Sequence, residues 1–209
     1  RVLGERRLRT LRDLAAHTGP VKREQDAWRE AARALEGNVL DVPFALLYRT
    51  SDAGERPELV ATAGWATDTA AAGSLSGALQ TNPLWPFASV AATQGPQFVP
   101  DVRALFAELP SGPSPEALHS ALILPISRSG AERLHGFLVA GLSARRAPDD
   151  DYRGFLGLVA DHIATAVSNA RAYEEEKKRA EALAELDRTK TAFFNNVSHE
   201  LRTPLSLIL

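Results

Sequence analysis

A histidine followed by a carboxylate and, one helical turn later, a hydroxyl lies near the C-terminus of this 209-residue chain. The segment reads Ser198-His199-Glu200-Leu201-Arg202-Thr203-Pro204. A neutral imidazole is a nucleophile, and a carboxylate that holds one ring N–H raises the nucleophilicity of the other nitrogen. On a helix Thr203 lies on the same face as His199, where its hydroxyl can orient a water or a phosphoryl oxygen. These residue types at this spacing could carry out nucleophilic chemistry at His199 with help from Glu200 and Thr203, although a lone exposed histidine more often has no such role.

The residues before His199 predict the long helix that must present it. No Gly or Pro occurs between Gly157 and Pro204, and acidic residues at 149–151 suit the positive N-terminal end of a helix. Beyond a charged run at 174–179, apolar residues step by threes and fours, which is the spacing of a coiled-coil seam. This seam comprises Leu183, Leu186, Lys190, Phe193, Val197, Leu201 and Leu205.

The seam predicts a parallel homodimer in which His199 faces solvent. His199 lies two residues, or about 200° of helix rotation, from both Val197 and Leu201. If those two side chains face the partner helix, the imidazole points outward, where it can meet a bulky reactant. Lys190 within the seam can help to set the register of the two chains. A single solvated helix is the disfavoured alternative, since a charged helix of this length is not expected to persist without a partner.

Pro204 predicts a bend directly after His199. Proline has no N–H, and its ring clashes with the carbonyl of Glu200 four residues earlier. Inside a helix it costs about 3 kcal/mol and kinks the axis. We therefore expect a hinge at this point.

Two helices are predicted in the first part of the chain. Apolar residues at three- and four-residue steps mark residues 1–17 and about 21–35. The first is either an ordinary amphipathic helix or a linker from an upstream domain, and the lack of an initiating Met favours the linker. Trp28 lies on the apolar face of the second helix and is expected in the core.

Short apolar runs separated by turn residues predict two hairpins and a further short strand. Apolar residues occupy nearly every strand position instead of alternating, so both faces of the sheet must be covered. The expected fold class is α+β, an antiparallel sheet flanked by helices. The predicted strands are residues 44–48, 58–63, 97–102, 121–126 and 136–142.

The irregular segment between the hairpins is expected to cover one face of the sheet. Its aromatic side chains Trp65, Trp85 and Phe87 either line a small-molecule cavity or fill the core, and packing is favoured because most aromatics pack. His119 and His135 lie near strand starts. Two isolated histidines lack the third ligand that a metal site needs, so both are interpreted as structural and no metal site is expected.

Composition excludes several kinds of site. The formal net charge is −2, which gives no electrostatic basis for nucleic-acid binding. The chain has no Cys, so it can hold no disulfide, catalytic thiol or thioether-linked cofactor. Charged residues at the start and the lack of a long apolar run predict a cytoplasmic location, with a membrane anchor before Arg1 left open. Because the chain has no Met and ends in an apolar run, we expect an excerpt of a longer protein.

The C-terminal segment, preceded by Phe194 and Asn196, resembles the H-box of bacterial two-component sensor histidine kinases. The resemblance implies that His199 attacks the γ-phosphate of ATP, held with Mg²⁺ on a separate ATP-binding domain whose Asn and Gly-rich boxes are absent here. Glu200 is then the general base, and Thr203 acts in dephosphorylating the partner response regulator. The phosphoryl group passes to an Asp of the regulator's receiver domain. This chain alone is expected to be inactive.

The order of elements upstream resembles a GAF domain: helix, hairpin, irregular segment, hairpin and long exit helix. A PAS domain is the nearest rival, but the helix before the first hairpin and the long final helix favour GAF. No bilin can be attached without Cys, and the Asn-Lys-Phe-Asp-Glu pattern of cyclic-nucleotide GAF domains is not present, so the ligand stays open. The predicted domains are a linker helix (1–18), a GAF-like sensor (19–173), a coiled-coil signalling linker (174–190) and the truncated first helix of a phosphoacceptor, or HisKA, domain (191–209).

Together these resemblances predict a sensor kinase whose GAF-like domain regulates phosphorylation of His199. One alternative is a non-catalytic GAF module that dimerises or binds a small-molecule ligand, with the coiled coil as a stalk. A hybrid protein with an output other than a kinase is a third reading. The sequence beyond Leu209 decides among them, since a kinase requires an ATP-binding domain there.

Overall fold

The computed structural model describes residues 2–50, 57–64, 85–102, 120–127, 134–142 and 149–205. Within these ranges, side chains are described from Leu3 to Ser198. Trp65 and His119 lie outside the described residues, so the expectations for them stay predictions.

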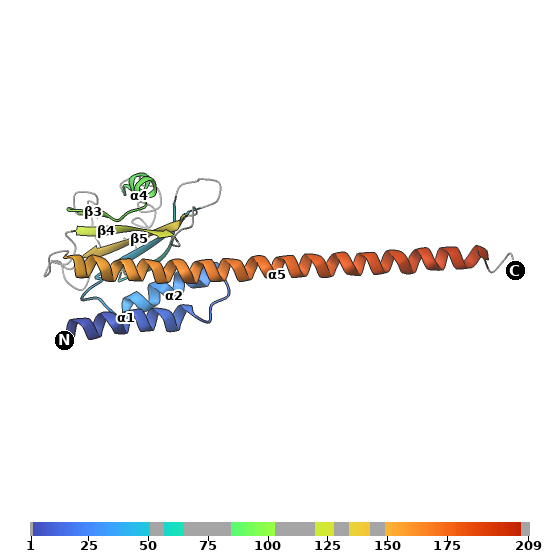
Figure 1. The fold of residues 1–209 in the computed structure, drawn as a ribbon, viewed down its shortest axis with the longest axis horizontal. Coiled ribbons are helices and arrows are strands. Elements are labelled where there is room, and N and C mark those ends of the chain that lie inside the picture. The colour runs from blue at the N-terminus through green and yellow to red at the C-terminus, as the bar shows by residue number, and fades with distance from the viewer. Residues whose placement is uncertain are drawn as a thin grey trace, which may run out of the picture.

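The centre of the fold is a five-stranded antiparallel sheet of order β2-β1-β5-β4-β3 (Figure 1). Both predicted hairpins are confirmed: β1 pairs with β2, and β4 pairs with β5. Pairing of β1 with β5 joins the hairpins, with Leu47 opposite Leu138. The strands are β1 (Ala45–Arg49), β2 (Glu58–Ala63), β3 (Gln97–Val99), β4 (Ser120–Ser127) and β5 (Leu134–Leu142).

The edge strand β3 is shorter than the predicted 97–102. It ends at Val99, directly before Pro100. A proline has no N–H to donate to the ladder, so pairing with β4 stops there.

Helices α2 (Glu24–Glu36) and α5 (Asp150–Leu205) cover one face of the sheet, and α1 (Val2–Thr18) packs on the outer side of these two helices (Figure 1). Trp28 of α2 is fully buried in the core they form with the sheet, as expected. Residues 1–18, predicted as a linker helix, pack on the domain through the fully buried Leu14.

The opposite face is covered by α4 (Phe87–Thr93) and the residues beside it (Figure 1). Successive residues of β1 enter different cores: Leu47 packs with the helices, whereas Leu46 and Tyr48 pack under α4. The prediction that both faces are covered is therefore confirmed. It explains why the strands lack the apolar–polar alternation of a half-exposed sheet.

Helix α5 begins with a side-chain cap and packs on the sheet through one stripe. Asp149 Oδ1 accepts a hydrogen bond from the backbone N–H of Tyr152 at 2.8 Å. The buried residues of this stripe include Phe155, Val159 and Ile163, whereas Leu158 is 52% exposed. Leu158 lies about 200° around the helix from the buried Leu156, so it points away from the sheet.

Beyond the domain, α5 continues as one helix to Leu205 (Figure 1). All side chains from Glu175 to Asn196 are exposed. We call residues 175–205 the stalk. Among the helices of the described residues, none combines the length and apolar character needed to cross a membrane.

Candidate functional site

The predicted catalytic residues lie in the last turns of the stalk. His199, Glu200 and Thr203 all fall within α5, beyond the last turn that contacts the domain near Glu174. At 1.5 Å per residue, about 38 Å of helix separates Glu174 from His199. The side chains of these three residues lie outside the described part, so the outward direction of His199 and its pairing with Glu200 stay predictions. Pro204 lies within the helix, and the bend predicted there also stays a prediction.

The seam predicted on the stalk is apolar and exposed in a single chain. Leu183, Leu186 and Phe193 are 67%, 66% and 62% exposed. The stalk's surface also carries ion pairs one turn apart, which support a helix by only about 0.2–0.5 kcal/mol each. These pairs are Lys177–Glu181, Glu175–Arg179 and Glu185–Arg188, each at 3.7 Å. The single chain leaves these large apolar side chains in water, and the homodimer predicted through the seam stays a prediction.

Where α5 leaves the domain, four polar side chains connect it to the sheet and to α2. Arg171 Nη2 donates to Glu24 Oε1 at 2.7 Å, and Arg171 Nη1 lies 3.2 Å from His135 Nδ1. The other ring nitrogen of His135 lies 2.8 Å from Ser168 Oγ. We call Glu24, His135, Ser168 and Arg171 the exit network. It joins the first turn of α2 and the start of β5 to the last turns of α5 that pack on the domain.

The surroundings of Glu24 stabilise its charged form. Burial raises the pKa of this carboxyl, but hydrogen bonds from Arg171 and Trp28 outweigh burial and hold it below its ordinary value. Trp28 Nε1 donates to Glu24 Oε1 at 3.2 Å. Next to this pair, Lys22 Nζ lies 5.0 Å from the centre of the Tyr173 ring. The start of α2 is thus bound to α5 by charge as well as by packing.

Sequence reasoning recognised only part of this network. His135 was interpreted as structural, and the structure places it in β5, buried and hydrogen-bonded. Glu24 and Arg171 were missed, because they are 147 positions apart and no local pattern pairs them.

A second set of polar contacts, around Asp41, binds α1 to the beginning of α5. Arg6 Nε donates to Asp41 Oδ2 at 2.7 Å, and the Tyr152 hydroxyl donates to the backbone carbonyl of Asp41. Arg7 stacks over the Tyr152 and Phe155 rings at 5.0 and 5.3 Å. Burial raises the pKa of Asp41, and bonds from Arg6 and Asn38 lower it to below its ordinary value. Helix α5 is therefore anchored at both ends of its contact with the domain.

The face under α4 is packed with aromatic rings. Phe87 stacks on Phe137 with centroids 4.5 Å apart and lies 4.8 Å from Tyr48. Trp85 is 4% exposed beside them. Burial raises the pKa of the Tyr48 hydroxyl, with a smaller opposing effect of its hydrogen bond with Trp85. Trp85 is thus buried in this core, and Phe87 is half-buried and packs against it, whereas the alternative of a ligand cavity stays a prediction. We call these four residues the aromatic cluster.

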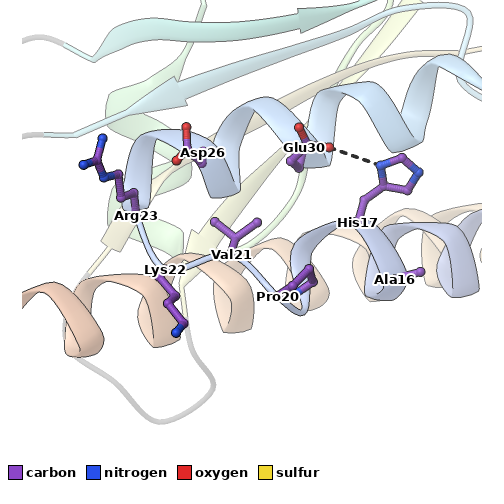
Figure 2. A pocket seen from close by; sticks show the side chains of 8 residues that line it. All are labelled: Ala16, His17, Pro20, Val21, Lys22, Arg23, Asp26 and Glu30. Carbon is purple, nitrogen blue, oxygen red and sulfur yellow. Dashed lines mark hydrogen bonds and ion pairs between the residues drawn. The ribbon is translucent and has the colours of Figure 1, made fainter.

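A shallow, open hollow of about 730 Å³ lies between the end of α1 and the start of α2 (Figure 2). His17 Nδ1 and Glu30 Oε2 lie 3.2 Å apart at one end. The lining mixes cations, carboxylates and small apolar groups, so it presents no convergent set of groups for one class of ligand. Its residues are Ala16, His17, Pro20, Val21, Lys22, Arg23, Asp26 and Glu30. Within the described part of the chain, His, Asp and Glu also form no group of three or more suited to a metal ion.

Comparison with known proteins relates the chain to one family and, over part of its length, to a histidine kinase. The family model described as GAF domain matches residues 22–168. The circadian input-output histidine kinase CikA of Synechocystis sp. is 33% identical over 111 residues, which cover 44% of this chain and 14% of that kinase. The chain thus spans only a small part of this relative.

Solved structures share the fold at low sequence identity. A GAF domain from a phosphoenolpyruvate-protein phosphotransferase of Coxiella burnetii has a TM-score of 0.58 and 19% identity, covering 82% of this chain and 98% of that one. Residues 122 to 287 of a methyl-accepting chemotaxis protein have a TM-score of 0.54 and 19% identity, covering 76% of this chain and 97% of that one. A bacteriophytochrome from R. palustris has a TM-score of 0.53 and 15% identity, covering 85% of this chain and 40% of that one. At these identities the likeness concerns the fold alone.

Proposed function

The chain belongs to the GAF domain family through residues 22–168, and from this premise we propose that it is the sensory, N-terminal part of a two-component sensor histidine kinase. The similarity to a histidine kinase of Synechocystis supports the proposal. So does the resemblance of the segment around His199 to a kinase H-box. In this proposal the GAF domain receives the signal and His199 receives the phosphoryl group.

The observation that carries the proposal is the continuity of α5. One helix runs from Asp150, through turns that are buried in the domain core, to Leu205, past His199. A helix resists bending and twisting far more than a loop does, so a shift where it leaves the domain is passed to its far end. The exit network lies at that point of departure, where a signal in the domain can act on the helix.

The proposed reaction is phosphoryl transfer from ATP to His199. A ring nitrogen of His199 forms a bond to the γ-phosphorus while the bond from that phosphorus to the bridging oxygen breaks, and ADP leaves. Glu200 takes the proton that the imidazole loses. ATP and Mg²⁺ are held by an ATP-binding domain outside this chain, and the phosphoryl group then passes to an Asp of a response-regulator receiver domain. Thr203 acts in a separate step, the removal of the phosphoryl group from that regulator.

The proposed assembly is a parallel homodimer through the stalk. The exposed Leu183, Leu186 and Phe193 repeat at coiled-coil spacing and gain partners when two stalks pair. Each leucine that becomes buried contributes about 1.5–3 kcal/mol. Pairing also brings the two copies of His199 to the same level, within reach of the catalytic domains of the dimer.

The aromatic cluster favours one alternative function. Its rings fill the described part of the space under α4, as in a domain that joins two copies without binding a ligand there. In that case the protein is a non-catalytic module and the stalk serves dimerisation only. The two functions differ in whether His199 is phosphorylated.

Phosphorylation of the intact protein that contains this chain distinguishes them. The protein is incubated with Mg²⁺ and ATP labelled at the γ-phosphate, and acid-labile, alkali-stable label is measured. We expect label in the unaltered protein and in His162→Gln, an exposed histidine on the same helix, and none in His199→Gln. Equal labelling of His199→Gln, or no label in any of the three, would contradict the proposal.

A further inference from the structure

The hydrogen bonds of His135 require the neutral imidazole in one tautomer. A guanidinium has only N–H donors, so the contact of Arg171 Nη1 with His135 Nδ1 at 3.2 Å needs Nδ1 as the acceptor. The proton of the neutral ring then lies on Nε2, which donates to Ser168 Oγ at 2.8 Å. The residue is only 7% exposed, so water cannot easily replace these partners.

A second proton on His135 is incompatible with this arrangement. It would place an N–H of a cation 3.2 Å from an N–H of Arg171, another cation. Donor then faces donor and like charges meet, so the contact between β5 and α5 at Arg171 must open. Ser168 can still accept from Nε2, and the effect is therefore specific to Arg171.

The charged groups around His135 decide which way Arg171 moves. From α2, the carboxylate of Glu24 holds Arg171 at 2.7 Å. From β1, Arg49 also acts on Glu24 by its charge, and it pairs with Glu58 of β2 at 2.7 Å. From α5, a carboxylate oxygen of Glu174 lies 3.5 Å from the backbone N of Glu24. Because Glu24 stays ionised well below neutral pH, Arg171 keeps this partner when it loses His135.

We propose that His135 makes the exit network a proton-controlled contact between the sheet and the exit helix. Neutral His135 ties β5 to α5 through Arg171. Protonation opens the contact between β5 and Arg171, while Ser168 still holds His135 and Glu24 still holds Arg171. The last domain-bound turns of α5 thereby lose one of the two polar contacts that tie them to β5. Imidazole is the side chain whose charge ordinarily changes nearest to neutral pH, so acidification supplies the proton. This inference concerns the domain itself and does not depend on the proposed kinase.

The first test uses the 209-residue chain without substitution. Nitrogen NMR of the histidine side chains reports the tautomer of His135, and hydrogen–deuterium exchange reports the opening of residues 166–174. At pH 8 we expect the Nε2–H tautomer. Between pH 8 and 5.5, the exchange of this segment, corrected for its intrinsic pH dependence, should rise roughly tenfold in step with protonation of His135, as for the loss of one hydrogen bond. An Nδ1–H tautomer, or exchange that stays constant while His135 takes up its proton, overturns the proposal.

Matched variants test whether His135 is the responsible group. His135→Gln cannot gain a charge, so the rise in exchange at low pH should disappear, whatever the overall stability of the variant. His17→Gln and His162→Gln remove exposed histidines and should keep the rise. If His135→Gln folds and keeps the rise, another group controls the segment and the proposal fails. If it does not fold, the tautomer and exchange of the unaltered chain still decide.

Discussion

Glu24 illustrates how one carboxylate fastens two helices at the point where α5 leaves the domain. Its oxygen accepts from both Arg171 and Trp28, and the residue lies in the first turn of α2, where a negative charge is favoured. Removing that charge leaves the guanidinium of Arg171 half-buried without its anion. The loss of stability is therefore that of leaving a partly buried cation without its anion, which is larger than the loss from breaking an exposed ion pair.

Glu24→Gln should therefore destabilise the folded chain by about 1–2 kcal/mol at pH 7. The pKa of Glu24 is lowered in the folded state, so its contribution is complete above the ordinary carboxyl range and is lost as pH falls through the folded pKa. The difference between the variant and the unaltered chain should thus shrink as the pH falls from 5 toward 3. Urea unfolding at several pH values measures it.

Glu30→Gln is the matched control for this prediction. Glu30 lies on the same helix and pairs with His17 and Arg33 at the surface. Exposed pairs contribute at most about 1 kcal/mol, so this variant should change the free energy of unfolding little at any pH. Equal losses in both variants would show that the position of Glu24 in the exit network has no special effect.

Gly141 shows a second kind of constraint, that of space. A Cβ at this position in β5 would lie 2.3 Å from ring carbons of Phe44, which is 1% exposed. Gly154 in α5 is the opposite case, because no atom lies within 4 Å of a Cβ built there.

Gly141→Ala should destabilise the chain by about 1–3 kcal/mol, since the ring of Phe44 must move within a packed core. Gly154→Ala should be neutral or stabilising by up to about 1 kcal/mol, because alanine favours a helix over glycine. Thermal or urea unfolding compares the two. A Gly141→Ala variant as stable as Gly154→Ala would show that the core under α4 is looser than these contacts indicate.

At the scale of elements, the stalk is the part whose surface lacks a complement. Its leucines and phenylalanines follow coiled-coil spacing, and they are exposed in the single chain. A second stalk provides the same pattern and so covers the seam without any other partner.

Leu183→Glu combined with Leu186→Glu should weaken the dimer by on the order of a hundredfold or more, because two buried leucines are replaced by like charges. Sedimentation equilibrium of the 209-residue chain measures the dissociation constant. Ala184→Glu adds a charge one position away from the seam and should leave the dimer intact. A monomeric unaltered chain, or equal dimerisation of all variants, would refute pairing through this seam.

Elements were predictable where local pattern decides them. The apolar runs of β1, β4 and β5 and the periodicity of α1, α2 and α5 led to the observed elements within a few residues. The exit network could not be predicted, since Glu24 and Arg171 meet only through the packing of α2 on α5. The segment around His199 was singled out by its resemblance to a kinase H-box, and the role of His199 stays a prediction.

For the whole molecule, α5 is both a core element of the domain and the carrier of His199 (Figure 1). Two sets of polar contacts anchor this helix, one at Asp41 near its start and one at Glu24 where the helix leaves the domain. We therefore expect a change in the domain that alters either anchor to shift or rotate the stalk. The central claim is that His199 responds to the angle at which the domain holds this helix.

Deletions in the stalk test that claim most directly, through the rate of His199 phosphorylation in the intact protein. Removing residues 175–181 changes the angle between domain and seam by only about 20°, whereas removing residues 175–176 rotates it by about 200°. We predict that the seven-residue deletion keeps the rate close to that of the unaltered protein. The two-residue deletion should change it by about tenfold or more, within the usual range of coupling between sites. Equal rates in both deletions and the unaltered protein would contradict the account.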